Sequence, residues 1–380
     1  MNDATEDRCA DQDRLRAWLT LAHAPGLGAA GIRALVERFG GPCRVLAAAG
    51  GLRAGEELPA AALDFLGQPD PAPIERDLAW AAGERNYLIT LDDPVYPRLL
   101  RQIPDPPPVL YLHGEPAAPA LLGLALVGSR NPTAGGSATA HDFAAHLAGA
   151  GLVIVSGLAL GIDAAAHQGA LDAGGVTVAV AGTGLDRVYP ARHRELAHRI
   201  AERGALVSEF PPGTPPLPAN FPRRNRLISG LGLGTLVVEA APKSGSLITA
   251  RAATEQGREV FAIPGSIHNP LARGCHALIR QGAKLVETAD HILEELGPLA
   301  AAGAEQAAPA PGNAAATLGA DYLRLLECMG HEPVGVDQLV DRSGLTAEQV
   351  SSMLLLLELE DRVVSAPGGR YTRVPNESLK

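Results

Sequence analysis

Two stretches of this 380-residue chain, LALVGSR at 124–130 and VIVSGLALGIDAAAH at 153–167, decide its fold class. Each opens with a short apolar run, ends that run in glycine or serine, and continues into a segment of helix length. The pattern returns four times, with apolar runs at 177–180, 206–207, 236–238 and 260–262. Short strands that alternate with helices are typical of an open parallel sheet. We therefore predict an α/β fold, a Rossmann-like doubly wound parallel sheet.

Residues that could bind a ligand come directly after these predicted strands. They begin at Gly128, Ser156, Gly182, Ser208, Glu239 and Pro264. In open α/β sheets, ligands bind at the edge formed by the carboxyl ends of the strands. The sequence therefore predicts a single site at this edge, built from several loops.

The stretch FPRRNRLISGL at 221–231, which we expect to be a loop, carries side chains that suit nucleic acid. The guanidinium groups of Arg224 and Arg226 can each hold a phosphate through two hydrogen bonds. Asn225 can contact a base edge or a sugar, and Phe221 offers a flat face for stacking. This mixture favours nucleic acid over a small metabolite.

A second loop, KSGSLITA at 243–250, follows the predicted strand at 236–238. It places one cation and two hydroxyls, on Lys243, Ser244, Gly245 and Ser246, before a helix expected to begin near Leu247. Backbone N–H groups at such a helix start bind phosphate. The alternative is an ordinary helix start with a solvated lysine. We favour phosphate binding, because both loops should reach the same sheet edge.

The net charge of −10 limits where nucleic acid can bind. Affinity comes largely from neutralised phosphates, so an acidic chain must gather its cations locally. Two clusters of arginine do this, one formed by Arg187, Arg192, Arg194 and Arg199 and the other by Arg223, Arg224 and Arg226.

Cofactors, metal ions and catalysis are not expected. The glycines at 182 and 184 lack the third glycine of a dinucleotide-binding loop, and no G-x-x-x-x-G-K-[ST] motif is present. The cysteines at 9, 43, 275 and 328 have no zinc-ligand spacing, so we expect reduced thiols, with Cys275 in a loop. We predict no cofactor, no metal site and no catalytic residue.

Four titratable residues near the strand ends are expected to be structural. Asp163 and His167 stand four apart on a predicted helix, and we expect them to hydrogen bond to each other. Glu209 and Glu239 are either the acids of a hydrolase or partners that orient the arginines. Since no nucleophile accompanies them, we favour the orienting role.

Five motifs, in a fixed order, resemble the DNA-processing protein A (DprA/Smf) family. They are Gly128-Ser129-Arg130, SGLALGIDAAAH at 156–167, GTGLDRVYP at 182–190, FPRRNR at 221–226 and KSGSLITA at 243–250. The resemblance implies a homodimer that binds single-stranded DNA, protects incoming DNA during natural transformation and loads the RecA recombinase onto it. It places the dimer interface at 274–286, with Leu278 and Ile279 as contacts.

The resemblance also implies which residues hold the DNA. Arg192 and Arg194 stand close to Ala191, where the family often has a lysine, and can substitute for it. We expect one anionic pocket that gathers Arg130, Arg224, Arg226 and Lys243. The full predicted set is Gly128, Ser129, Arg130, Ser156, Gly157, Arg192, Arg194, Phe221, Arg224, Asn225, Arg226, Lys243, Ser244, Gly245 and Ser246.

The chain is expected to form a helical domain at 10–85, a Rossmann-like DNA-binding domain at 86–296, a linker at 297–317 and a winged-helix-like domain at 318–380. The helical part suggests a helix-hairpin-helix or SAM-like domain with its turn at 25–28, and a packing hairpin is favoured over a phosphate-binding one. The linker is rich in alanine, proline and glycine. Acidic residues between Glu348 and Asp361 favour an interaction module over a major-groove reader.

The N-terminal sequence MNDATEDRCADQDR has no apolar signal region, and no stretch approaches a membrane span. A cytoplasmic protein without membrane contact is therefore expected.

Two rival hypotheses stay open. A related Rossmann-like family hydrolyses nucleoside monophosphates, and Gly232-Leu233-Gly234-Thr235 echoes half of its P-G-G-x-G-T-x-x-E motif. The other rival is a scaffold whose pocket has lost its ligand. Release of free base from AMP, assayed beside single-strand binding, separates the three hypotheses.

Overall fold

The computed structural model describes residues 11–49 and 58–297, and beyond them residues 325, 328–329, 334–346, 350, 353–354, 357, 363–366 and 370–373. Contacts divide the chain into two compact units, Met1–Ala307 and Ala308–Lys380. Apart from its first residue, the predicted linker at 297–317 lies outside the described residues. The division of the first unit into domains at 10–85 and 86–296 stays a prediction.

Five α-helices are described at the start of the first unit, within residues 11–49 and 58–81. They are α1 (Asp11–His23), α2 (Ala29–Phe39), α3 (Pro42–Ala48), α4 (Ala60–Gly67) and α5 (Pro71–Ala81). The expected turn at 25–28 separates α1 from α2. Trp18 and Leu19 of α1 share a buried cluster with Val109 and Tyr111 of the sheet, so the helices and the sheet are one packed body.

The sheet has nine strands in the order β1-β2-β6-β5-β4-β3-β7-β8-β9. The six predicted apolar runs form β3 to β8, which are all parallel to one another, and the predicted fold class is confirmed. The strands are β1 (Asn86–Thr90), β2 (Val109–Gly114), β3 (Gly123–Gly128), β4 (Val153–Ser156), β5 (Thr177–Val180), β6 (Ala205–Ser208), β7 (Gly234–Val238), β8 (Glu259–Ala262) and β9 (Lys284–Leu285).

The sequence patterns missed β1 and β2, at one side of the sheet, and β9, at its other edge. β1 pairs antiparallel with β2, and β2 pairs antiparallel with β6. Between them runs the proline-rich stretch at 94–108, which includes the short helix α6 (Arg98–Arg101). Prolines cannot donate to a strand ladder, so they mark the connection and not the strands on either side of it.

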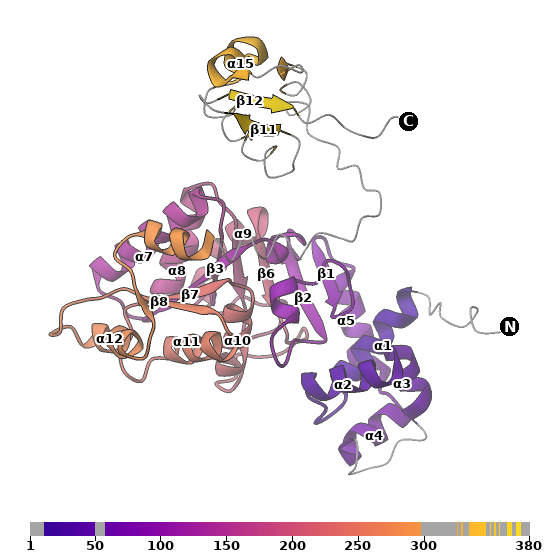
Figure 1. Cartoon of the computed structure of the whole chain (residues 1–380). Coiled ribbons are helices and arrows are strands. Elements are labelled where there is room, and N and C mark those ends of the chain that lie inside the picture. Colours follow the sequence, from indigo (N-terminus) through magenta and orange to yellow (C-terminus); the bar gives the residue numbers. More distant parts are fainter. Residues whose placement is uncertain are drawn as a thin grey trace, which may run out of the picture. The chain divides into compact units, whose positions relative to one another are not determined.

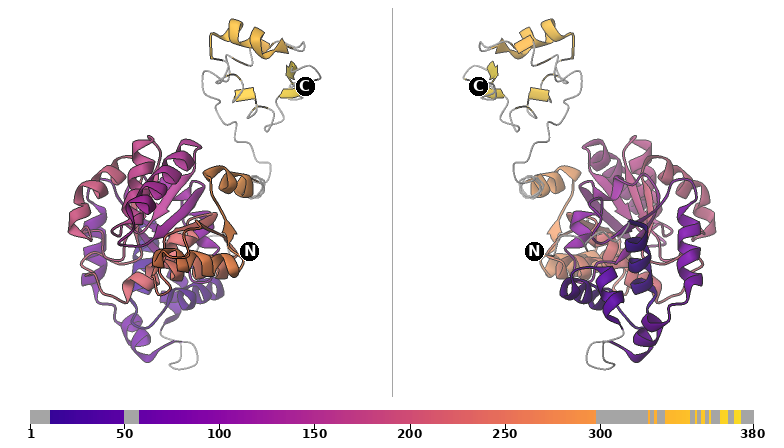
Figure 2. Two further views of the ribbon diagram at one scale, coloured as in Figure 1. Left: turned by 90° about the vertical axis from the view of Figure 1, so that its left-hand side faces the viewer. Right: turned by 90° about the vertical axis from the view of Figure 1, so that its right-hand side faces the viewer.

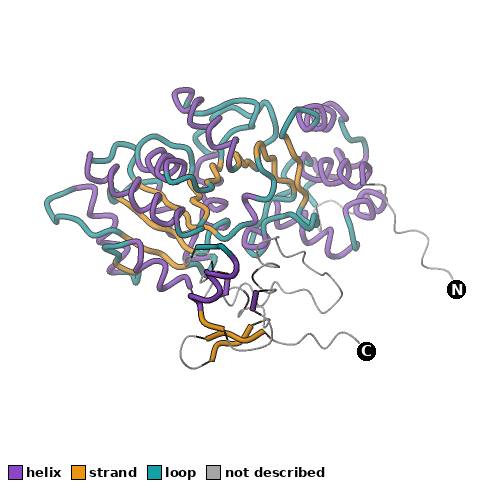
Figure 3. Tube along the Cα trace, turned by 90° about the horizontal axis from the view of Figure 1, so that it is seen from above, coloured by secondary structure: helices purple, strands orange, loops and turns teal. Residues whose placement is uncertain are grey.

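Helices cover both faces of the sheet (Figures 1 and 2). Alternate residues of β3 point to opposite faces, so Leu124 and Leu126 join one buried cluster while Ala125 and Val127 join another. The first cluster includes residues of α7 (Ala134–Gly149) and α8 (Ile162–Asp172). The second includes residues of α10 (Asn220–Gly230), α11 (Ser246–Glu255) and α12 (Arg273–Arg280). In Figure 3 the strands run between these layers, and the N-terminal helices gather at one end.

The strand order reverses between β3 and β7. From β3 the chain proceeds outward through β4, β5 and β6, and it then returns to the other side of β3 for β7, β8 and β9. Loops at the carboxyl ends of β3 and β7 therefore leave in opposite directions and open a crevice between them. Such a reversal is where open α/β sheets bind ligands.

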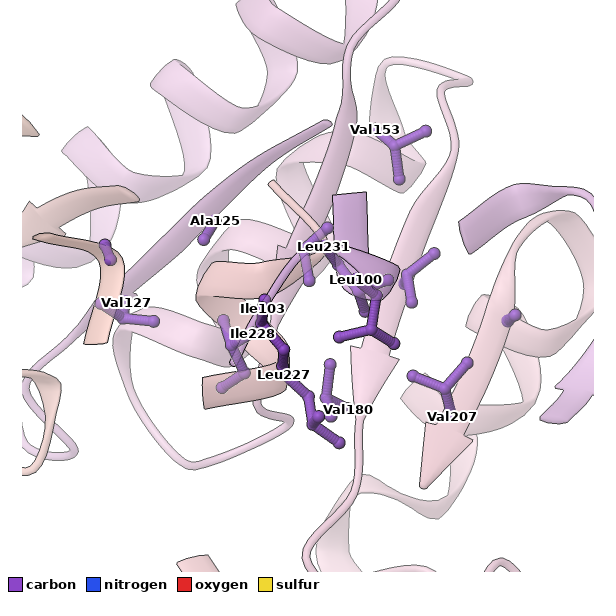
Figure 4. Packing of buried hydrophobic residues seen from close by; sticks show 14 of the residues in the cluster. Leu100, Ile103, Ala125, Val127, Val153, Val180, Val207, Leu227, Ile228 and Leu231 are labelled. Carbon is purple, nitrogen blue, oxygen red and sulfur yellow. The ribbon is translucent and has the colours of Figure 1, made fainter. Parts of the chain in front are cut away.

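Helix α10 is fixed against the sheet by an apolar face. Leu227, Ile228 and Leu231 are almost fully buried. Figure 4 shows them among Leu100 and Ile103, close to valines of the sheet. Polar residues on the first turns of α10 are thereby held at the carboxyl edge.

The second unit contains a three-stranded antiparallel sheet in the order β10-β12-β11, with α15 (Val336–Ser343) directly after β10. Its strands are β10 (Val334–Gly335), β11 (Val363–Ala366) and β12 (Arg370–Arg373). Leu325, Leu339 and Leu357 are among the residues of its core. The acidic residues between Glu348 and Asp361 lie outside the described residues.

None of the described helices has the length and apolar composition needed to cross a membrane.

Cys43 is disulfide-bonded, contrary to the expectation that all four cysteines are reduced thiols. A lone cysteine far from any other in sequence gives no sign of its partner, which is why the pattern missed it.

A buried carboxyl group joins the helical segment to the sheet. Asp77 of α5 is 1% exposed, and its Oδ2 lies 2.7 Å from both His23 Nε2 and Tyr111 Oη. Burial, and after it the nearby Asp77, raise the pKa of Tyr111 well above its ordinary value, so the phenol stays protonated and donates. The other carboxyl oxygen, Oδ1, has no hydrogen-bond partner.

We predict that Tyr111→Phe lowers the free energy of unfolding by about 1–3 kcal/mol, because it removes a buried hydrogen bond and leaves Asp77 short of a donor. Urea unfolding measures the change. Tyr87→Phe is the matched control, since Tyr87 is 39% exposed and should change stability little. Equal effects of the two substitutions would contradict a structural role for the Asp77 contact.

Candidate nucleic-acid interface

A hollow of about 670 Å³ lies at the carboxyl edge of the sheet. Turns that follow β3, β4 and β7 meet there with the first turns of α10. Ten of the fifteen predicted DNA-binding residues line it, namely Gly128, Ser129, Arg130, Phe221, Arg224, Asn225, Lys243, Ser244, Gly245 and Ser246. The two stretches singled out in the sequence thus converge as expected.

One wall of the hollow is suited to an anion. Helix α11 begins at Ser246, and its N-cap, Gly245, has no side chain to cap the helix. The hydroxyls of Ser244 and Ser246 lie 2.7 Å apart, and Ser244 Oγ accepts a hydrogen bond from Ser246 N. An anion at this end of α11 is favoured by the helix dipole. The predicted helix start near Leu247 is confirmed to within one residue.

Two exposed cations line the same hollow as this helix start. Arg130 and Lys243 both line the hollow, and across the described part of the chain neither has a carboxylate within ion-pair distance. The Arg130 guanidinium lies 5.9 Å from the centre of the Phe221 ring, which is within cation–π range. These cations are free to neutralise a bound phosphate.

Another part of the lining, the aromatic wall, is apolar and aromatic. The rings of Tyr189 and Phe221 lie 5.6 Å apart, and Tyr189 is 50% exposed. Pro216, Pro218 and Ile248 also line the hollow. Of these residues, only Phe221 was predicted. Two signals in the sequence were missed. They are Tyr189, near the end of GTGLDRVYP, and the proline-rich run after β6.

The arginine-rich stretch is a helix, not the loop that the sequence suggested. Pro222 sits in the first turn of α10, where no backbone hydrogen bond needs its missing N–H. The apolar residues Leu227, Ile228 and Leu231 then anchor the helix on the sheet. Proline, asparagine, serine and glycine in one stretch disguised a helix that tertiary packing stabilises.

Arg224 lines the hollow but is 4% exposed. Its Nη1 donates to Gly157 O at 2.8 Å and also to Val180 O. Burial lowers its pKa to about 10, still far above neutral pH, while the charge of Asp163 partly offsets the effect of burial. The side chain is therefore charged and already bonded to the protein.

Arg226 is not part of the hollow. Its guanidinium pairs with Glu209 at 3.0 Å and with Asp105 at 2.6 Å. Glu209 also pairs with Arg223 at 2.8 Å, so the prediction that Glu209 orients arginines is confirmed. The expectation that four cations gather in one pocket holds for Arg130, Arg224 and Lys243 only.

Four other predicted residues lie outside the lining. Ser156 is fully buried and donates to Leu126 O, and Gly157 supplies the carbonyl that Arg224 contacts. Arg192 and Arg194 are exposed where η3 (Ala191–His193) leads into α9 (Arg194–Arg203). They follow Tyr189 in the chain, and their DNA contact stays a prediction.

Glu239 does not orient an arginine, which corrects the prediction. Its carboxylate accepts hydrogen bonds from Thr133 N at 2.8 Å and Thr133 Oγ1 at 2.7 Å, and from Asn269 Nδ2 at 3.2 Å. Thr133 is the N-cap of α7. A side chain of this protein thus occupies the start of α7, the helix that follows β3.

Asp163 and His167 do not form the expected pair. Asp163 Oδ2 accepts from Gly157 N and Ala159 N, whereas His167 Nδ1 bonds to Thr177 Oγ1. Burial lowers the pKa of His167 to about 3, so the ring is neutral. Residues four apart on a helix do face the same way, but here each is closer to a different strand end.

Cys275 lies in α12, not in a loop, and is fully buried. Burial raises the pKa of its thiol to about 11, so it is a poor nucleophile. Within residues 11–49, 58–297 and the described parts of the second unit, no three potential ligands among His, Cys, Asp and Glu come together.

Comparison with known proteins agrees with this architecture. Residues 87–297 match the family described as DNA recombination-mediator protein A, and residues 308–369 match the DprA winged helix domain. "Protein Smf" of Escherichia coli is 45% identical over 307 residues, which are 79% of this chain and 81% of that protein.

Two solved structures share the fold. DNA processing protein A of Streptococcus pneumoniae matches with a TM-score of 0.65 at 36% identity, over 76% of this chain and 98% of that one. DNA processing protein A of Helicobacter pylori, in a structure described as giving insights into its single-stranded DNA binding mode, matches with a TM-score of 0.51 at 30% identity, over 56% and 96%. The chain therefore belongs to the DNA recombination-mediator protein A (DprA/Smf) family of DNA processing proteins.

Proposed function

We propose that this protein binds single-stranded DNA in the hollow at the carboxyl edge of its sheet. The observation that carries the proposal is that unpaired cations and aromatic rings line the same hollow. Arg130 and Lys243 offer free positive charge for phosphates, while Phe221 and Tyr189 offer rings for unpaired bases. The Helicobacter pylori relative, described as binding single-stranded DNA, supports the proposal.

Family membership supports a finer proposal. The protein protects incoming DNA during natural transformation, loads the RecA recombinase onto it and works in the cytoplasm without catalysing a reaction.

In the nucleoside-monophosphate hydrolase hypothesis, Gly234 would belong to a ligand loop. Here Gly234 begins β7, and a side chain on it would crowd Phe261 and Glu259.

Direct phosphate contacts are proposed for Arg130, for Lys243 and for the turn that leads into α11. Replacing either cation by methionine should weaken binding to oligothymidylate. It should also flatten the dependence of log affinity on log salt by about 0.7 for each phosphate that the variant no longer neutralises. Fluorescence anisotropy across a salt series measures both quantities.

Arg203→Met is the charge-matched control, because Arg203 is exposed at the end of α9 and does not line the hollow. It should leave the salt slope unchanged. If Arg130→Met and Lys243→Met fold normally and bind as the wild type does, the hollow serves another ligand.

We also propose that α12 contributes to a homodimer through Leu278 and Ile279. Both residues are partly buried against the core. Leu278 also lines a second hollow, of about 480 Å³, together with residues of α11. An apolar side chain at the rim of such a hollow fits a contact between subunits.

Leu278→Arg should convert the dimer to a monomer, since a charge would be desolvated at the interface. Sedimentation velocity at micromolar concentration measures the change, and thermal unfolding checks the fold. Leu121→Arg, at a position 49% exposed and just before β3, should leave the dimer intact. A wild type that is already monomeric, or a Leu278→Arg variant that is still dimeric, would contradict the proposal.

A further inference from the structure

We propose that Arg224 positions the base-stacking wall of the hollow and does not itself bind a phosphate of the DNA. The inference rests on the proposed single-stranded DNA site. It gives Arg224 a positioning role and leaves phosphate binding to Lys243. It also departs from the expectation, drawn from the sequence, that Arg224 and Arg226 each hold a phosphate.

The donors of Arg224 are already engaged. Nη1 contacts two carbonyl oxygens, those of Gly157 and Val180, directly after β4 and at the end of β5. Nε donates to Asn225 Oδ1 at 3.3 Å. A bidentate phosphate contact requires two free donors in a fork that DNA can reach. With 4% of its surface exposed, Arg224 does not present such a fork.

The remaining nitrogen, Nη2, lies in an equally tight place. A methyl group built on Gly157 would lie 2.8 Å from Arg224 Nη2 and also 2.8 Å from Asp163 Oδ2. The guanidinium and the Asp163 carboxylate thus crowd the same backbone position, where a side chain larger than that of glycine would force them to shift. Asp163 supplies the counter-charge that makes a buried guanidinium tolerable.

What Arg224 holds is the start of α10, and with it the aromatic wall. Phe221 lies one turn earlier on the helix, and its ring centre is 6.0 Å from the Arg224 guanidinium. The ring rests on Gly182, where any side chain would come within 2.9 Å of it. A hydrogen bond from Asn220 Nδ2 to Gly182 O, 3.2 Å long, holds the same turn of α10.

Replacing Arg224 should therefore weaken base stacking and leave the number of neutralised phosphates unchanged. The two are separable, because stacking depends little on salt whereas each neutralised phosphate contributes to the salt slope. Lys243 is the comparison, since it is exposed and has no ion-pair partner among the described residues.

The test measures oligothymidylate affinity across a salt series for Arg224→Met, Phe221→Ala, the double variant and Lys243→Met. Arg224→Met should lower the affinity about tenfold and keep the wild-type dependence of log affinity on log salt. Lys243→Met should flatten that dependence. In the Phe221→Ala background, Arg224→Met should lower the affinity by less than about a further twofold, because its effect acts through the ring of Phe221. A flattened slope for Arg224→Met, or losses that multiply in the double variant, would overturn the inference.

A second measurement uses the wild-type protein, in case Arg224→Met does not fold. Phenylglyoxal modifies accessible arginines, and mass spectrometry locates them. Arg130 should be modified and then protected by oligothymidylate, whereas Arg224 should resist modification with or without DNA. Modification of Arg224 that DNA prevents would overturn the inference. A wild type that fails to bind oligothymidylate would overturn the proposed function, and this inference with it.

Discussion

The parallel pairing of β3 with β7 is the constraint on which the site depends. These strands are neighbours only because the strand order reverses between them, and Gly128 pairs with Val238 at their carboxyl ends. A side chain on Gly128 would overlap the carbonyl oxygen of Val238, so glycine permits the close approach. The turns that follow then deliver Arg130 and Lys243 to one hollow from separate parts of the chain.

The charge available to a ligand is smaller than the number of arginines suggests. Glu209 and Asp105 neutralise Arg226, and Glu209 also pairs with Arg223. Ion pairs of this kind fix geometry and contribute little to an external ligand. Two unpaired cations and one helix start thus lie together at one hollow of a protein with a net charge of −10, as the proposed phosphate contacts require.

Sequence patterns were sufficient where a signal is local. The apolar runs located β3 to β8, and the loops after these strands located the hollow, because both follow from composition along a short stretch. Partners far apart in the chain were beyond reach. Nothing near Arg226 indicates that it pairs with Asp105, which is 121 residues away, and nothing near Glu239 indicates that it bonds to Thr133, which is 106 residues away. Helix α10 was missed for the same reason, since distant apolar contacts stabilise it.

Ultraviolet crosslinking of oligothymidylate to the full-length protein, followed by peptide mass spectrometry, tests the central claim most directly. Thymine forms photoadducts with aromatic rings that it touches, so adducts report where bases lie. The account predicts adducts on Tyr189 and Phe221, in the aromatic wall of the hollow. Adducts confined to the hairpin turn at 25–28 or to residues after 308 would place the DNA elsewhere and contradict it.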